Sequence, residues 1–477
     1  MSTQSEFNTD AERHLSPSGR NLIQAALRHR EARIHLPRTR ATRMTTMAVM
    51  ALPAAWALGL AEFMWPVLAL PMAFFLLSRE RVRMPRSFLI WLAYLAIAVV
   101  AVVSAGDGAR ILTVYLAASI VFLFAFNATS DELPDSAIVA LIGLYWVVVA
   151  VGGVLALIFG TTEFPSLANT LFVDESNAGT FWDDVTRVQL SDGLKVGEQS
   201  GLVVDHRPKG FLAYANHFGA ALVMFLPALA LLRAQLLKGR WARALDIAAV
   251  VAVIPFVISR NRWAWLSLVV VAVYLIARLW RPHPKAARVM LTGLSLMLLL
   301  VAVTPLQGIV TDRLQSESSK QYRSDQYSLS WELIQMSPWL GFGGNQTGDD
   351  PLLSSPSEFE DLNLGADSQI LQTTVNHGIP ALIVYAVWLF AIVIAARSID
   401  TPVLAVTHLA GLVAILHTPF YVLTPHRWVL LMLLAGASFR HLHAQGRVGT
   451  VTLWSKTGSL EARARRGRRR DFRRNRS

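Results

Sequence analysis

Eight cationic side chains stand beside predicted helix ends or inside two long polar stretches of the chain. They are Arg207, Lys209, Arg260, Arg262, Arg313, Lys320, Arg323 and Arg427. The planar guanidinium fork of arginine matches the oxygen atoms of a phosphate, so this set would suit a lipid-linked phosphate or diphosphate. The alternative is that these are interfacial residues whose stems lie along apolar surface. That alternative is weakest for Arg260 and Arg262, which share one short connection.

Aromatic side chains alternate with these cations along the chain. The sequence holds 14 tryptophans, and the face of a tryptophan ring can stack on a sugar or bind a cation. Most of them are expected in the aromatic belts at the two membrane surfaces. Trp331 and Trp339 instead lie inside the second polar stretch, and we expect these two to contact a substrate.

The elements that must position these side chains are membrane helices. With 477 residues, 53% of them hydrophobic and 16% charged, the chain is too apolar for a soluble globular protein. A membrane-spanning helix needs ~20 apolar residues. Twelve windows qualify: 45–63, 64–78, 88–104, 110–127, 137–160, 210–232, 243–259, 262–278, 289–304, 369–395, 402–418 and 426–442. The first two windows favour a helical hairpin or one re-entrant segment.

The distribution of lysine and arginine predicts the orientation, because basic residues near short loops stay in the cytoplasm. Twelve spans with both ends inside place 33 of the 44 lysines and arginines in the cytoplasm. We therefore expect an all-α polytopic protein of the inner membrane with about 12 transmembrane helices and two large external loops. Its parts are a basic cytoplasmic N-tail (1–44), helices 1–5 (45–160), an external acidic loop (161–209), helices 6–9 (210–304), a large external loop (305–367), helices 10–12 (368–442) and an Arg-rich cytoplasmic C-tail (443–477).

The predicted spans carry almost no charge. They hold no lysine or aspartate well inside a helix, and His408 and His417 are the ionisable groups that we place at depth or close to an end. Ion-coupled transporters keep carboxylates inside the membrane as a relay. This pattern argues against a proton-driven transporter.

Other kinds of site are disfavoured. The chain has no cysteine, so it has no disulfide or thiolate metal site. The carboxylates of the two polar stretches lack the spacing of a calcium loop, and we predict neither a metal nor a cofactor. The Arg-rich tail would suit nucleic acid, but anionic membrane lipid is the preferred partner. The first 44 residues lack the apolar segment of a removable signal peptide.

Four stretches resemble the superfamily of O-antigen ligases and O-antigen polymerases, which are membrane enzymes of bacterial envelope glycan synthesis. The first runs from Arg207 to Gly219, and the second is Ser259–Trp265. The third begins at Arg313, continues through Arg323 and Trp331, and ends in Pro338-Trp339-Leu340-Gly341-Phe342-Gly343. It is the most specific of the four. The fourth comprises Asp367–Leu371 together with Gly378 and Ile379.

The resemblance implies metal-independent transfer of a glycan from an undecaprenyl-diphosphate carrier to a glycan or lipid acceptor outside the membrane. It assigns Arg260 or Arg262, together with Arg323, to the diphosphate. Arg207, Arg313, Trp331 and Trp339 complete the substrate-binding set. Runner-up hypotheses are a transporter or flippase of a lipid-linked or anionic solute, and a catalytically inactive relative.

The proton acceptor departs from the pattern of the family. Asp367 stands where such proteins usually carry a histidine, and a carboxylate can also accept a proton from a sugar hydroxyl. His377 is a second catalytic candidate, although a straight helix from Asp367 would put it about three turns into the membrane. Asp367 could instead cap the helix that begins at Ser368.

Overall fold

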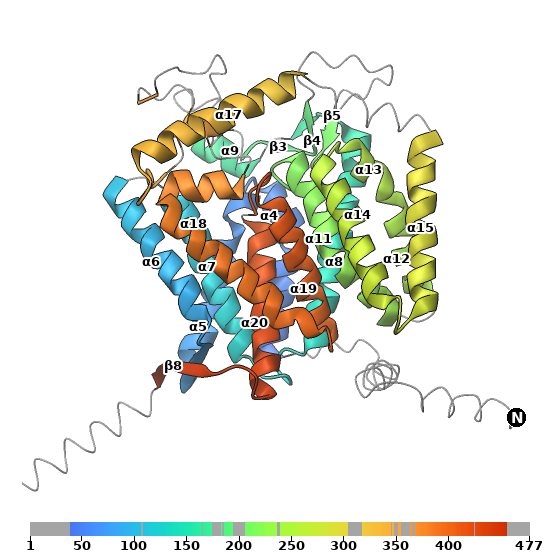
Figure 1. The fold of residues 1–477 in the computed structure, drawn as a ribbon, viewed down its shortest axis with the longest axis horizontal. Coiled ribbons are helices and arrows are strands. Elements are labelled where there is room, and N and C mark those ends of the chain that lie inside the picture. The colour runs from blue at the N-terminus through green and yellow to red at the C-terminus, as the bar shows by residue number, and fades with distance from the viewer. Residues whose placement is uncertain are drawn as a thin grey trace, which may run out of the picture.

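The computed structural model describes residues 39–105, 108–164, 166–173, 183, 186–193, 206–235, 239–303, 317–344, 346–347, 352–353, 363–364, 368–423 and 425–455. These residues form a bundle of helices packed side by side (Figure 1). Its helices are α3 (Arg40–Met50), α4 (Leu52–Ala57), α5 (Met64–Ser78), α6 (Phe88–Ala105), α7 (Ala109–Asn127), α8 (Asp135–Phe159), α11 (Ala215–Gln235), α12 (Arg240–Val251), α13 (Val253–Ile258), α14 (Arg262–Leu279), α15 (Pro284–Val303), α18 (Gln369–Ala395), α19 (Pro402–His417) and α20 (His426–Ala444). Two 3-10 turns, η1 (Ala61–Phe63) and η2 (Ala396–Ser398), join neighbouring helices.

The protein is a mostly helical membrane protein. Among the described residues, eight helical segments are long and apolar enough to cross a membrane, and α19 is a shorter apolar helix. The first of the eight, 61–78, follows α3 and α4, and α3 packs against α5. The windows 45–63 and 64–78 therefore form a helical hairpin and not one re-entrant segment.

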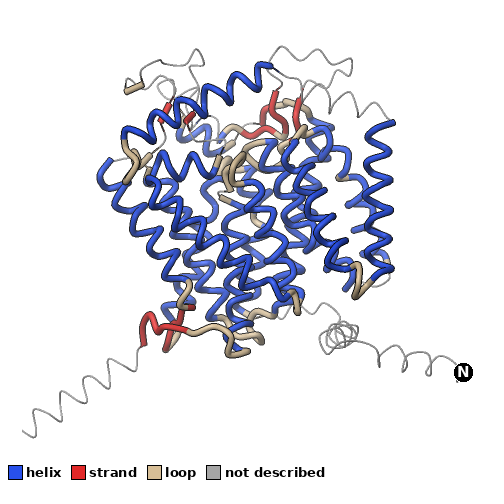
Figure 2. Tube along the Cα trace, in the orientation of Figure 1, coloured by secondary structure: helices blue, strands red, loops and turns tan. Residues whose placement is uncertain are grey.

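The bundle has two different ends. At one end, α17 (Glu317–Met336) lies across the helices, beside α9 (Leu167–Phe172) and short strand pairs (Figures 1 and 2). We call this the loop end. The pairs are β2 (Glu163–Phe164) with β3 (Val188–Gln189), β4 (Ser191–Gly193) with β5 (His206–Pro208), and β6 (Gln346–Thr347) with β7 (Asn363–Leu364). At the other end, which we call the tail end, β1 (Arg81–Pro85) pairs antiparallel with β8 (Thr450–Ser455).

The core is apolar and rich in aromatic rings. Helix α20 packs along α7, α8 along α11, and α6 along α18. Phe88 and Phe122 stack with ring centroids 4.4 Å apart, and Trp388 packs edge-on against both of them. By contrast, only 22% of the 240–258 segment and 17% of α14 are buried. The apolar side chains that these helices expose suit contact with lipid.

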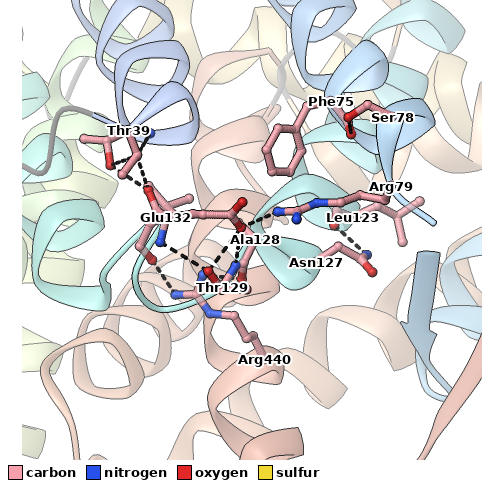
Figure 3. Close-up of polar contacts among 12 residues, drawn as sticks. Thr39, Phe75, Ser78, Arg79, Leu123, Asn127, Ala128, Thr129, Glu132 and Arg440 are labelled. Atoms are coloured by element: carbon pink, nitrogen blue, oxygen red, sulfur yellow. Dashed lines mark hydrogen bonds and ion pairs between the residues drawn. The ribbon is translucent and has the colours of Figure 1, made fainter. Parts of the chain in front are cut away.

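A polar latch closes the tail end (Figure 3). It centres on the turn between α7 and α8, where the Glu132 carboxylate pairs with Arg79 and accepts a hydrogen bond from the Thr129 backbone at 2.8 Å. From α20, Arg440 donates to the carbonyl oxygens of Ala128 and Leu133 at 2.9 and 2.8 Å. The residue after α5 and helix α20 therefore converge on one turn.

Candidate functional site

Helix α18 is broken at the loop end. Gly378 has φ +81° and ψ 172°, which no helix contains, and Pro380 follows two residues later. The backbone therefore changes direction immediately after His377, and the part after the break runs down the bundle beside α6 (Figure 1). The stretch from Gln369 to His377 is continuous, so His377 lies at the end of the first part of α18 and the break follows it.

The loop after α17 is fixed to this break by backbone hydrogen bonds. Phe342 N donates to Val375 O, Gly343 N to Asn376 O and Ile379 N to Pro338 O, each at 2.8 Å. The carbonyl groups of Val375 and Asn376 are free to accept because the helix is interrupted just after them. The Pro338 to Gly343 stretch, which carried the most specific resemblance, thus acts as a clasp between α17 and α18.

The glycines of this clasp are required by space as well as by conformation. Gly341 has φ +65° and Gly343 has φ +73°. A Cβ atom on Gly341 would lie 2.5 Å from the backbone nitrogen of His377, and one on Gly343 would lie 2.6 Å from the carbonyl oxygen of Ala101. Real Cβ atoms do not approach so closely, so the clasp accepts only glycine at both positions.

His377 is enclosed behind the clasp. The side chain is 1% exposed, and its ring centroid lies 6.0 Å from that of Tyr94 and 6.3 Å from that of Tyr115. Within the described part of the chain, neither ring nitrogen has a side-chain partner. A buried polar group left in this state costs about 1–3 kcal/mol, so His377 is available to a ligand.

The two predicted tryptophans face outward at the loop end. Trp331 on α17 is 57% exposed, and Trp339 in the clasp is 73% exposed. Arg323 lies two helical turns before Trp331 on the same helix and is half-buried. The clasp therefore holds the backbone of Trp339 beside the break that follows His377, while Arg323 and Trp331 lie further back along α17.

A second group of predicted residues meets where α13 joins α14. Arg207 of β5 donates to the Ser259 carbonyl oxygen and to Asn216 Oδ1, both at 3.0 Å. Asn261 caps α14 by accepting from Ala264 N at 3.0 Å. Two of the resembling stretches, which lie far apart in the sequence, thus come together.

Arg260 occupies the strained position in this junction. It is 3% exposed and has φ +52°, a left-handed conformation that costs a non-glycine residue about 1–2 kcal/mol. Arg262 begins α14 directly beside it and is half-buried. Strain of this kind persists where the surroundings impose it, often at functional sites.

Several predicted residues have other positions or lie outside the described residues. Lys209, one of the eight cations, forms an ion pair with Asp192 at 2.9 Å. Arg313 and Asp367 lie outside the described residues. The alternative role of Asp367 as a helix cap is wrong, because the N-cap of α18 is Ser368, whose hydroxyl accepts from Leu371 N at 3.2 Å.

One cluster at the loop end joins Arg427, one of the eight cations, to two residues that the sequence reasoning did not assign to a site. Glu62, His426 and Arg427 are 6%, 3% and 2% exposed, and Glu62 lies in a candidate span. The expectation of spans without a buried carboxylate was therefore wrong. The burial of Glu62 was not predicted because this residue stands where the first two windows meet, near a helix end, where a carboxylate usually reaches water.

The described residues contain no group of three or more histidine, aspartate or glutamate side chains that could hold a metal ion. The groups at the loop end that can donate, accept or carry charge are arginine, histidine, carboxylate and tyrosine side chains.

The residues around this site match a known family. Residues 247–386 match the family model described as O-Antigen ligase. This match supports the resemblance to the O-antigen ligase superfamily over that part of the chain. No curated protein matches the chain.

The segment of the O-antigen ligase match covers most of the predicted site. It includes the α13–α14 junction, α17, the clasp and the first part of α18. Arg207 and the cluster of Glu62, His426 and Arg427 lie outside it. The match thus supports a membrane glycan ligase type of role, and the family implies lipid-linked glycan substrates.

Proposed function

We propose that this protein is a glycosyltransferase that moves a glycan from an undecaprenyl-diphosphate carrier to an acceptor outside the cytoplasmic membrane, in cell-surface polysaccharide synthesis. The observation that carries the proposal is the clasp, since the most specific family-like stretch, which includes the exposed Trp339, is fixed to the backbone around the buried His377. The acceptor is a glycan or a lipid.

The proposed orientation puts the loop end outside and both termini in the cytoplasm. It rests on the 33 of 44 basic residues that twelve spans would keep inside. The proposed domain division follows the same count, with external loops at 161–209 and 305–367. An undecaprenyl-linked substrate would then meet the loop end at the outer membrane surface.

In the proposed reaction, the oxygen of an acceptor hydroxyl attacks the anomeric carbon of the carrier-linked sugar. The bond from that carbon to the phosphate oxygen breaks, and the electron pair leaves with undecaprenyl diphosphate. Arg260 or Arg262, together with Arg323, would neutralise the charge that develops on the leaving group. Guanidinium groups can do this without a metal ion.

The hydroxyl proton needs an acceptor, and two side chains are candidates. Asp367 stands at the usual histidine position of the family. His377 is supported by its burial and by ring nitrogens that no side chain occupies in the described residues. Either would act as a general base if it lies within hydrogen-bond reach of the acceptor hydroxyl.

A transporter or flippase of a lipid-linked solute is the second candidate. It is favoured by the buried Glu62 and Arg427, because ionisable groups inside a membrane usually serve transport or proton movement. A catalytically inactive relative is a third, since Asp367 replaces the family histidine.

Deletion of the gene, followed by analysis of lipid-linked and surface glycan, tests the proposal. Short unpolymerised repeats would indicate polymerase activity, and full-length chains retained on the carrier would indicate ligase activity. If the protein is a transporter, its deletion would instead leave the substrate on the inner leaflet. Transfer by the purified protein with outward-facing substrate separates the enzyme from the transporter and from the inactive relative.

A further inference from the structure

The cluster of Glu62, His426 and Arg427 has a defined internal geometry. The indole Nε1 of Trp65 donates to Nδ1 of His426 at 2.9 Å. Because indole is only a donor, Nδ1 is the acceptor and the imidazole proton of neutral His426 sits on Nε2. Nε2 lies 3.7 Å from Oε1 of Glu62, which is too long for a hydrogen bond.

Three polar atoms of this cluster have no hydrogen-bond partner in the described part of the chain. They are Oε1 of Glu62, Nε2 of His426 and Nη1 of Arg427. The other terminal nitrogen of Arg427, Nη2, donates to the Val422 carbonyl oxygen. Buried polar groups without a partner are rare, and such a group usually binds a water, an ion or a ligand.

Tyrosines from two other helices extend the cluster. Arg427 lies within electrostatic range of Tyr145 on α8 and Tyr385 on α18. Both hydroxyl groups are buried, and among the described residues neither has a hydrogen-bond partner. A phenol hydroxyl both donates and accepts, so the cluster offers donors, an acceptor and groups of either kind.

The acceptor oxygen decides which class of ligand fits. A phosphate would satisfy the donors Arg427 and His426, but it would meet the Glu62 carboxylate with like charge and leave Oε1 unpaired. A metal cation would meet the guanidinium of Arg427. Arg110 also lies within electrostatic range of Glu62, so the charge of the carboxylate already has positive neighbours. A hydroxyl-rich neutral group satisfies every atom, because each hydroxyl can donate to Glu62 and accept from Arg427 or His426.

We infer that Glu62, His426, Arg427 and the two tyrosine hydroxyls form a subsite for the hydroxyl groups of a neutral sugar unit of the glycan. The inference rests on the proposed function, which supplies the sugar. The inference extends the proposed site by residues that lie outside the segment matching the O-antigen ligase family. The role is binding and positioning, not proton transfer.

The test compares two lipids with the full-length protein in nanodiscs. One is undecaprenyl diphosphate, and the other is the native lipid-linked glycan extracted from cells lacking this gene. We expect the wild type to bind the glycan-bearing lipid more tightly. Glu62→Gln should weaken that binding about tenfold, since it leaves buried partners unpaired. It should change the binding of undecaprenyl diphosphate by less than about twofold.

Three results would overturn the inference. The first is an unchanged affinity of Glu62→Gln for the glycan-bearing lipid. The second is tighter binding of undecaprenyl diphosphate or inorganic pyrophosphate by Glu62→Gln, which would identify an anion site. The third is a wild type that does not distinguish the two lipids. Failure of the proposed function would be seen separately, as no transfer by the wild-type protein.

Two further variants guard against a folding defect. Tyr145→Phe keeps the ring and removes one hydroxyl, so it should weaken glycan binding less than Glu62→Gln does and without loss of thermal stability. Glu163→Gln is the matched control, because Glu163 also lies at the loop end but is exposed. It should bind both lipids like the wild type. A Tyr145→Phe variant that is stable and binds normally would also count against the subsite.

Discussion

Gly341 lies against the backbone of His377 so closely that a Cβ atom on the glycine would sit 2.5 Å from the histidine nitrogen. The contact joins the loop after α17 to the break in α18 and needs no side chain on the loop residue. The family-like glycines are therefore understood as packing requirements that place His377, and not as residues that touch a substrate.

We expect Gly341→Ala to abolish glycan transfer and to destabilise the protein by more than ~2 kcal/mol. The methyl group must displace the α18 backbone, and the left-handed conformation adds about 1–2 kcal/mol. Thermal unfolding in detergent and a transfer assay measure the two effects. Gly446→Ala is the control, because Gly446 has φ +71° and nothing within 4 Å of a Cβ atom. Equal losses in both variants would mean that the clasp contributes nothing beyond backbone strain.

Replacement of Arg260 or Arg323 by alanine should abolish transfer while membrane insertion is retained. Lysine should restore only part of the activity, because it lacks the bidentate fork that binds a diphosphate. Arg243→Ala, which removes an exposed arginine on α12 near the tail end, should transfer normally. Wild-type rates from both alanine variants with purified lipid-linked substrate would remove these arginines from the diphosphate site.

The tail-end latch should depend on pH. Partial burial raises the pKa of Glu132, but the hydrogen bonds from Thr129 and the Arg79 guanidinium outweigh it and bring the pKa below its usual value of 4.5. A lowered pKa in the folded state stabilises the protein above pH 4.5, and this stabilisation is lost as the pH falls through the folded pKa. Glu132→Gln should therefore lower thermal stability at pH 7 by about 1 kcal/mol or less. The difference from wild type should shrink as the pH falls below 4.5, and a difference that grows toward low pH would contradict the prediction.

Topology reporters test the orientation. Fusions after residues 185 and 350 should report an external position, and fusions after residues 85, 240, 285 and 460 a cytoplasmic one, because of the uneven distribution of basic residues. A cytoplasmic result at residue 350 would reject both the twelve-span arrangement and the proposed site.

The helices were predictable from sequence because their signal is local. A run of apolar residues identifies a membrane helix wherever it packs, and each predicted window coincides with a helix or a helical hairpin. The meeting of Arg207 with Ser259 was not predictable in the same way, since it depends on how α11 and α13 pack. The family resemblance identified the stretches that contain both residues, but it did not predict that they are in contact.

The break in α18 and the buried cluster show what the pattern misses. Gly378 and Pro380 stand in a continuous apolar window, and hydropathy alone does not reveal that the clasp donates hydrogen bonds to carbonyl groups of α18. Glu62 and Arg427 stand near the ends of their windows, where sequence favours exposure. In the folded chain, Oε1 of Glu62 in η1 lies 3.7 Å from Nε2 of His426 at the start of α20, and both residues are buried.

Three substitutions decide which side chain is the proton acceptor. Asp367→Asn keeps the shape of the side chain and removes its basicity, so it should lower transfer by about 10²- to 10⁴-fold if Asp367 is the general base. Asp367→His should then retain activity, since it restores the residue usual in the family, and His377→Ala should matter less. Because Ser368 caps α18, a loss in Asp367→Asn cannot be attributed to a lost helix cap. Near-wild-type turnover of Asp367→Asn at normal expression, together with inactive His377→Ala, would move the role to His377. Its ring, enclosed by Tyr94 and Tyr115, would then accept the proton away from bulk water.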